Sequence, residues 1–293
     1  MPLVDPQWET PERRALRDTV RGFVERHVLP YQDEWEREGL IPRELHREAA
    51  KLGLFGLGVD ESVGGSGGDL IDVSILGEEF HYAGGAGGVF ASLFTHGIAL
   101  PHLIAAGDPD QIDRWVRPTL AGEKIGSLAI TEPGGGSDVG HLTTRAERDG
   151  DEYVVNGAKT YITSAVRADF VVTAVRTGGP GASGVSLLVI EKDTPGFTVA
   201  RKLDKMGWRS SDTAELSFVD VRVPASNIVG AENSGFAQIA AAFVTERSGL
   251  AVQAYASAQR CLDLTLAWTR DRETFGKPLA ARQSVQDLSL IHI

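Results

Sequence analysis

Residues 129–138 of this 293-residue chain read AITEPGGGSD, and the sequence changes character on either side of them. Helical periodicity fills the chain before this stretch, whereas short β-branched runs follow it. The stretch itself comes after a predicted strand and brings three glycines, a serine hydroxyl and two carboxyl groups into one turn. Exposed backbone N–H groups in such a turn can bind an anionic or carbonyl-rich ligand. The stretch therefore predicts both a domain boundary and a ligand-binding loop.

Residues 1–124 are predicted to form an N-terminal helical domain. Thr10-Pro11-Glu12 is a helix start, because a capping hydroxyl precedes a proline at the first helical position. Apolar residues then keep helical spacing as far as Pro30. Further helices are predicted at residues 42–52, 69–82, 91–106 and 109–121.

Residues 125–232 are predicted to form a central β domain. Short β-branched runs lie at residues 153–155, 170–172, 184–190 and 213–223. Asn156-Gly157 lies between two of the predicted strands and is the strongest short signal for a hairpin turn. Recurring turn clusters indicate an antiparallel sandwich or barrel.

The helical pattern returns after Gly230, so residues 233–293 are predicted to be part of a C-terminal helical bundle. The order of helices, strands and helices gives an α+β fold and disfavours a Rossmann sheet. The last predicted helix, residues 282–293, ends without a cap or polar tail, which we interpret as a cut chain.

Composition and charge exclude several classes of protein. A net charge of −11 disfavours nucleic-acid binding. No apolar run approaches the roughly 18 residues of a membrane span, so no integral membrane segment is expected. Cys261 is the only cysteine, which excludes a disulfide framework and favours a reducing, cytoplasmic setting. The seven histidines show no ligand spacing, so no metal site is expected.

One catalytic motif is rejected on its context. Residues 64–68 read GGSGG and formally match the nucleophile elbow of α/β hydrolases. That elbow joins a parallel strand to a helix, whereas this segment lies in a helical region, so a flexible turn is predicted instead. A hydrolase would require thioester cleavage that depends on Ser66.

Four motifs, in the same order and over nearly the whole chain, resemble those of the acyl-CoA dehydrogenase family. They lie at residues 130–138, 156–163, 205–224 and 272–283. His141 departs from the first motif, where the family usually has a small residue. The resemblance implies an FAD-dependent oxidation of an acyl-CoA substrate to the trans-2-enoyl-CoA. It also implies electron transfer to an electron-transferring flavoprotein and assembly as a homodimer or homotetramer.

The resemblance also implies which residues contact the flavin. Thr131 and Thr163 would supply backbone and hydroxyl donors to the flavin's polar edge. Tyr161 would stack on the isoalloxazine ring, and Ser137 would also contact the pantetheine arm of CoA. The expected contacts are Leu128, Ile130, Thr131, Gly136, Ser137, Tyr161, Ile162 and Thr163. Three further residues would reach the flavin of a neighbouring subunit, namely Arg272, Phe275 and Gln283.

The candidate catalytic base is Glu246, on the helix predicted after Asn233. It falls on an apolar stripe formed by Phe236, Ile239, Phe243, Leu250 and Ala254. A buried carboxylate is costly unless it is paired or functional, and the pattern alone slightly favours a core ion pair.

The family resemblance gives Glu246 a different role. Thr245-Glu246-Arg247 resembles the isovaleryl-CoA and long-chain acyl-CoA dehydrogenases, whose base lies on this helix. This implies that Glu246 removes the α-proton, with Phe243, Val244 and Arg247 beside the substrate. A competing base in the family's final helices, which this chain lacks, stays open.

Two alternative functions remain at this point. A flavin oxidase or monooxygenase of the same fold would differ in the reactivity of its reduced flavin with oxygen. A non-catalytic binder of CoA thioesters would show no bleaching of bound FAD by any acyl-CoA.

Overall fold

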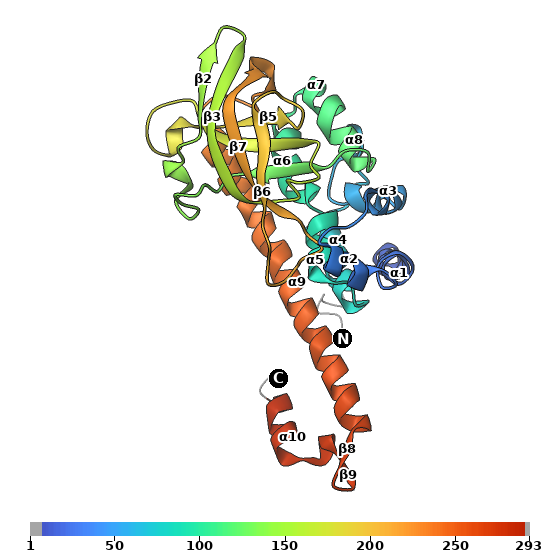
Figure 1. The fold of residues 1–293 in the computed structure, drawn as a ribbon. Helices are drawn as coiled ribbons and strands as arrows, with labels where there is room; N and C mark the ends of the chain where they lie inside the picture. Colours follow the sequence, from blue (N-terminus) through green and yellow to red (C-terminus); the bar gives the residue numbers. More distant parts are fainter. Residues whose placement is uncertain (1–7, 291–293) are drawn as a thin grey trace.

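The computed structural model describes residues 8–290, and it contains a helical region, a β region and a second helical region (Figure 1). The N-terminal helices are α1 (Pro11–His27), α2 (Gln32–Glu38), α3 (Arg43–Lys51), α4 (Leu70–Tyr82), α5 (Gly87–Leu93), α6 (His96–Ala106), α7 (Pro109–Gln111) and α8 (Arg117–Leu120). A π-helical turn, Ile112–Val116, joins α7 to α8. Thr10 caps α1 as predicted, because its hydroxyl oxygen accepts a hydrogen bond from the Arg13 N–H (3.3 Å).

Two details of the helical region differ from the prediction. The helix predicted at residues 91–106 begins earlier and is divided into α5 and α6, because Phe94 leaves the helical conformation between them. The sequence did not predict α2, whose seven residues are mostly charged and bury only Trp35. Such a segment has too little apolar periodicity to be detected.

The β region is one seven-stranded sheet. Its strands are β1 (Gly126–Ala129), β2 (Arg145–Asp149), β3 (Glu152–Thr163), β4 (Phe170–Arg176), β5 (Val185–Glu191), β6 (Phe197–Lys202) and β7 (Thr213–Pro224). The order is β1-β4-β2-β3-β7-β6, and β5 pairs with β4. Most pairs are antiparallel, which confirms the predicted fold class, although β4 runs parallel to β1 and, at one residue pair, to β2.

The hairpin predicted at Asn156-Gly157 is wrong. β3 runs through both residues, and the turn between β2 and β3 lies at Gly150 instead. The Asn156 side chain exchanges hydrogen bonds with Asp220 of β7, at 3.1 and 2.9 Å. Gly157 has φ +150° and lies so close to Thr144 that a Cβ would come within 2.6 Å of its Oγ1. The dipeptide marks a β-bulge, because the pairing with β7 shifts register here and then continues.

The second helical region is dominated by α9 (Gly235–Asp271), which extends past the other two regions (Figure 1). A short hairpin, β8 (Glu273–Thr274) with β9 (Lys277–Pro278), and α10 (Gln283–Leu290) follow at its far end. The sequence predicted the helices but not this hairpin. Residues 291–293, which were assigned to the last helix, lie outside the described residues.

A buried arginine joins the β region to the N-terminal helices. Arg167 pairs with Asp212 at 2.7 Å and donates to the backbone oxygen of Ile41 at 3.2 Å and to the Ser92 hydroxyl. Burial, together with the Arg167 charge, holds the pKa of the neighbouring His46 well below its usual value. These contacts fix the sheet against the N-terminal helices.

One stretch of the described residues, Gly87–Ala106, has the length and apolar composition of a membrane span, with a mean hydropathy of 1.5. It comprises two helices, α5 and α6, and 50% of the apolar window is buried inside the protein. Core helices have the same composition, so this stretch is weak evidence for a span.

Candidate functional site

A buried ion pair holds the glycine-rich loop against β3. The Lys159 ammonium donates to the backbone oxygen of Ile130 and to Glu132 Oε1, both at 2.9 Å. Thr143 donates to Glu132 Oε2 through its N–H (2.6 Å) and its hydroxyl (2.7 Å), and the Thr144 N–H donates to Oε1 (2.9 Å). Every oxygen of this carboxylate is therefore paired.

The pKa values of this pair keep both groups charged at neutral pH. Burial alone would raise the pKa of Glu132, but the Lys159 charge and the threonine hydrogen bonds lower it to about 2. Burial lowers the pKa of Lys159 to about 8, against the opposing effect of Glu132. The sequence motifs contain both residues, but no role was predicted for either, because an isolated lysine in a strand gives no sign that it is completely buried.

The two threonines of the site are not equivalent. Thr131 is paired with Thr160, because its oxygen accepts the Thr160 N–H (2.9 Å) and its hydroxyl donates to the Thr160 oxygen. The Thr163 oxygen accepts from the Ser127 hydroxyl (2.6 Å), while the Thr163 hydroxyl has no hydrogen bond to another described residue. Thr163 is therefore the better donor of a hydroxyl to a ligand.

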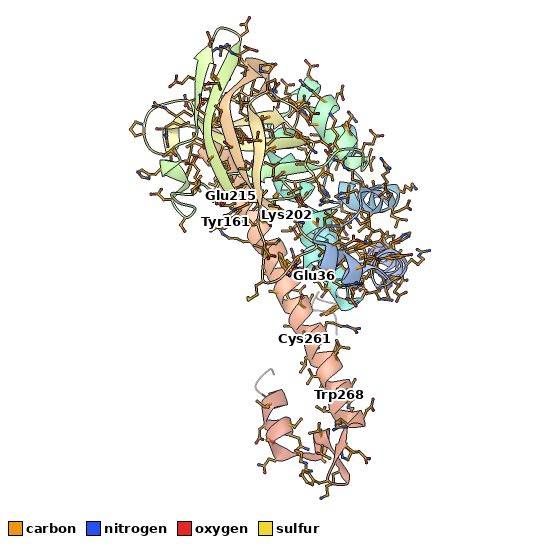
Figure 2. All side chains as sticks on the ribbon, in the orientation of Figure 1. Glu36, Tyr161, Lys202, Glu215, Cys261 and Trp268 are labelled. Atoms are coloured by element: carbon orange, nitrogen blue, oxygen red, sulfur yellow. The ribbon has the colours of Figure 1, made fainter. Side chains whose placement is uncertain are left out.

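A bulge in β3 exposes the side chain of Tyr161 to solvent. The register with β7 shifts between Lys159 and Ile162, which inserts one unpaired residue. Tyr161 has φ +60° and is 70% exposed, and Figure 2 shows it beside Glu215 of β7. Such a backbone conformation costs roughly 1–3 kcal/mol and clusters at functional sites. Ile162 is buried in the β core, so only its backbone is available to a ligand.

The glycine-rich loop has open space around it. A Cβ added at Gly134 or Gly135 would meet no atom within 4 Å, and at Gly136 it would lie 3.2 Å from the Thr131 methyl group. Ser137 is exposed. His141, which departs from the family motif, is exposed, and its Nδ1 lies 2.7 Å from Asp138 Oδ2, so it does not crowd the loop.

The end of β1 and the start of α9 share one hydrophobic core. Leu128 and Ile130 are buried in the same cluster as Ile239, and Phe243 packs against that cluster. Glu246 follows Phe243 by three residues, which is about one helical turn. Glu246 therefore lies about one turn from a residue that packs on the core shared by β1 and the N-terminal helices.

Glu246 is half-buried, and its Oε1 is completely buried without a hydrogen-bond partner. Burial raises the pKa of this carboxyl group, and the nearby Arg247 charge only partly offsets that effect. The Arg247 guanidinium lies over the Phe243 ring at 5.6 Å. Among residues 8–290, no cation lies within 4.0 Å of the Glu246 carboxylate, so a core ion pair does not explain it.

The apolar stripe predicted for α9 is wrong in part. Phe236 and Leu250 are 37% and 56% exposed, and Ala254 is also exposed. The side that faces the protein carries Val252 and Ala256 instead. This side of α9 packs against α4. Val244, predicted beside the substrate, is 64% exposed.

The residues predicted to reach a neighbouring flavin lie at the far end of α9. Arg272, Phe275 and Gln283 are exposed, and Arg282 lies over the Phe275 ring at 5.4 Å. Figure 1 shows this end well away from the sheet. The structure thus does not bring these three residues together with the glycine-rich loop of their own chain.

Comparisons with known proteins match every part of the fold. Family models for the N-terminal, middle and C-terminal domains of acyl-CoA dehydrogenase match residues 10–123, 127–221 and 233–290. The mitochondrial long-chain specific acyl-CoA dehydrogenase of Rattus norvegicus is 38% identical over 94% of this chain, which spans 64% of that relative's length. The probable acyl-CoA dehydrogenase YngJ of Bacillus subtilis is 37% identical over 94% of this chain and 73% of its own.

Solved structures agree with these matches. A putative acyl-CoA dehydrogenase from Mycobacterium smegmatis has a TM-score of 0.96 and 71% identity, covering 97% of this chain and 74% of that one. A glutaryl-CoA dehydrogenase from the same organism, solved in complex with FADH2, has a TM-score of 0.89 and 29% identity, covering 98% and 73%. On these matches, the chain belongs to the acyl-CoA dehydrogenase family.

Proposed function

We propose that this protein oxidises an acyl-CoA thioester to the 2-enoyl-CoA, with FAD as cofactor and Glu246 as the base. The observation that carries the proposal is the buried, unpartnered Oε1 of Glu246. A carboxylate in this state has no structural partner to stabilise it, and its raised pKa makes it a stronger base than an ordinary glutamate.

The residues of the β side are suited to hold FAD. The Thr163 hydroxyl is free to donate, the exposed Tyr161 ring offers an aromatic face, and the glycine-rich loop leaves room for a ligand. FAD, when bound, accepts the hydride that leaves the β-carbon. The protein's part is to orient the thioester and to take the α-proton onto Glu246.

Further partners follow from the same proposal. Ser137 would contact the pantetheine arm of CoA, and Phe243, Val244 and Arg247 would lie along the acyl group. Electrons would pass to an electron-transferring flavoprotein. Arg272, Phe275 and Gln283 would act only in a homo-oligomer, because they lie far from their own chain's loop.

The test compares two substitutions of a carboxylate on α9. Glu246→Gln should slow flavin reduction by roughly 10²–10⁴-fold, the usual cost of losing a general base, while FAD stays bound. Asp263→Asn changes an exposed carboxylate of the same helix and should leave the rate unchanged. The measurement is anaerobic stopped-flow bleaching of flavin absorbance by an acyl-CoA panel.

Three outcomes would oppose the proposal. Bleaching at wild-type speed in Glu246→Gln would make this residue structural. No bleaching of the wild-type protein by any acyl-CoA would favour a non-catalytic binder. Rapid reoxidation of the reduced flavin by air would favour an oxidase or monooxygenase.

A further inference from the structure

Arg176, the last residue of β4, donates hydrogen bonds to four backbone oxygens of two loops. Its Nε donates to the Leu142 oxygen (2.9 Å) and its Nη2 to the Gly140 oxygen (2.7 Å). Its Nη1 donates to the Gly179 oxygen (2.5 Å) and the Gly181 oxygen (3.1 Å). These bonds use four of the five N–H donors of a guanidinium group. A single side chain therefore links two loops that are far apart in the sequence.

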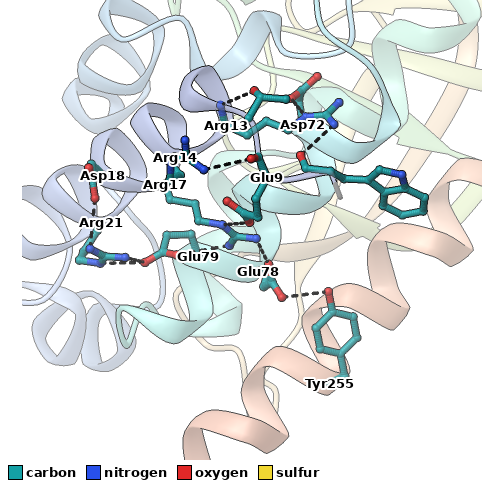
Figure 3. A network of polar contacts seen from close by, with 12 residues as sticks. Glu9, Arg13, Arg14, Arg17, Asp18, Arg21, Asp72, Glu78, Glu79 and Tyr255 are labelled. Carbon is teal, nitrogen blue, oxygen red and sulfur yellow. Dashed lines mark hydrogen bonds and ion pairs between the residues drawn. The ribbon is translucent and has the colours of Figure 1, made fainter. Parts of the chain in front are cut away.

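The partners of Arg176 differ from those of the buried arginine in the N-terminal helices. Arg17 of α1 lies 2.6 Å from Glu78 and 3.4 Å from Glu79 (Figure 3). Among residues 8–290, no carboxylate oxygen lies within 4.0 Å of the Arg176 guanidinium. Hydrogen bonds from a charged donor are strong, and the planar guanidinium fixes their directions. The bonds of Arg176 therefore restrain loop backbone instead of neutralising an acid.

The first loop, residues 136–142, follows the open glycines and carries the exposed Ser137. A 3₁₀ turn, Val139–His141, comes next. Among the described residues, the hydrogen bonds that reach this loop from other parts of the chain both come from Arg176. The conformation of the backbone after Ser137 therefore depends on these two bonds and on the packing of Leu142 in the core.

The second loop, residues 177–184, packs around the guanidinium itself. A Cβ added at Gly184 would lie 1.9 Å from the Gly179 oxygen and 2.8 Å from Arg176 Nη1, so a side chain there would displace the loop. The 3₁₀ turn of this loop, Ala182–Gly184, contacts the turn of the first loop. Arg176 therefore binds both loops where they meet.

The threonines expected to contact FAD are anchored by other bonds. Thr131 is paired with Thr160 of β3, and the Thr163 oxygen accepts from the Ser127 hydroxyl (2.6 Å). Neither anchor involves Arg176. A change at this arginine should therefore alter the binding of the CoA arm and leave the binding of the flavin unchanged.

We infer that Arg176 is a positioning residue for the acyl-CoA substrate, because it restrains the backbone on which Ser137 meets the pantetheine arm. The inference rests on the proposed function, in which Ser137 contacts that arm. A loop that is ordered before the substrate arrives loses less conformational entropy when the substrate binds. Since Arg176 acts through the loop, it should affect substrate binding and not the chemical step.

The test replaces Arg176 with lysine, which keeps the charge but lacks the planar set of donors that four oxygens require. Stopped-flow flavin reduction at increasing acyl-CoA concentrations separates the dissociation constant of the substrate from the limiting rate. In Arg176→Lys, the dissociation constant should rise about tenfold, as expected for the loss of roughly one hydrogen bond. The limiting rate and the FAD content should stay unchanged.

Arg148→Lys is the matched control. Arg148 is an exposed arginine of β2 that donates to the backbone oxygen of Gly150 (3.1 Å), in the turn between β2 and β3. This turn belongs to neither loop. Its loss of a hydrogen bond should therefore leave the dissociation constant and the limiting rate as in the wild type.

A double-mutant cycle tests whether Arg176 acts through Ser137. Ser137→Ala alone should weaken acyl-CoA binding, because it removes the hydroxyl that contacts the pantetheine arm. Adding Arg176→Lys to Ser137→Ala should then weaken binding less than Arg176→Lys does alone, because the contact that it positions is already lost.

The outcomes separate the inference from the proposed function. An unchanged dissociation constant in Arg176→Lys would overturn the inference alone, and so would fully additive losses in the cycle. Loss of FAD, failure to fold or a lower limiting rate in this variant would also overturn it, because the residue would then act outside substrate binding. No flavin reduction in the wild type by any acyl-CoA would overturn the proposed function as well.

Discussion

The β side and the α9 side of the candidate site differ in how completely their polar groups are paired. On the β side, Glu132 and Lys159 satisfy each other and the surrounding backbone inside the protein. On the α9 side, Glu246 keeps a buried oxygen without a partner. A paired network fixes geometry, whereas an unpaired buried group is free to act on a ligand. We conclude that the β side holds the geometry of the site, whereas the α9 side supplies the group that acts on the ligand.

The largest effect on stability is expected from breaking the paired side. Lys159→Met leaves the Glu132 carboxylate buried without its cation, which should cost about 3–5 kcal/mol of unfolding free energy. Lys51→Met removes an exposed pair with Glu48 (2.7 Å) and should cost about 0–1 kcal/mol. Denaturant unfolding of both variants measures the difference. Equal effects would show that the buried pair has no special role.

The pH dependence of stability gives a somewhat smaller effect on the same side. The folded pKa of Glu132, about 2, is below its usual value of 4.5, so its stabilisation is fully present above pH 4.5 and is lost as the pH falls towards 2. That loss amounts to about 3 kcal/mol. Unfolding free energies between neutral and acidic pH should decline less steeply in Glu132→Gln than in the wild type. Identical slopes would contradict the assignment.

The smallest effect concerns the exposed aromatic residue of β3. Tyr161→Asn should stabilise the flavin-free protein by about 1 kcal/mol, because asparagine tolerates the positive φ that tyrosine adopts here. It should also weaken FAD binding, since the ring is lost. Tyr161→Phe keeps ring and strain and should change neither quantity. Thermal melts measure the stability, and flavin release curves measure the affinity for FAD. Unaltered FAD binding in Tyr161→Asn would show that the Tyr161 ring does not contact the flavin.

The sequence predicted the fold class and the position of the glycine-rich loop, because helical and β periodicities alternate in long blocks. It mistook Asn156-Gly157 for a turn, since only the partner strand reveals that a positive-φ glycine belongs to a bulge. It also misjudged the stripe on α9. Periodicity locates apolar residues such as Leu250, but the contacting face depends on the neighbouring helix.

The sequence predicted which residues belong to the candidate site, but not how deeply each is buried or what it hydrogen-bonds to. The sequence placed Glu246 on the buried side of α9, and in the structure the side chain is half-buried with its Oε1 fully buried. It gave no sign that the Thr131 hydroxyl is used inside the protein. The Thr131 hydroxyl pairs with Thr160, 29 residues further along the chain, so such a contact becomes visible only in the folded protein.

The central claim is that Glu246 is an unpaired base with a raised pKa. The most direct test is the pH dependence of flavin reduction by a saturating acyl-CoA, in the wild type and in Asp263→Asn. Because the base must be ionised to take the α-proton, the rate should fall as the pH drops through the pKa of Glu246. We predict that this decline is centred above 4.5, the usual value for a glutamate, in both proteins. A rate that stays constant down to pH 4.5 would contradict the account.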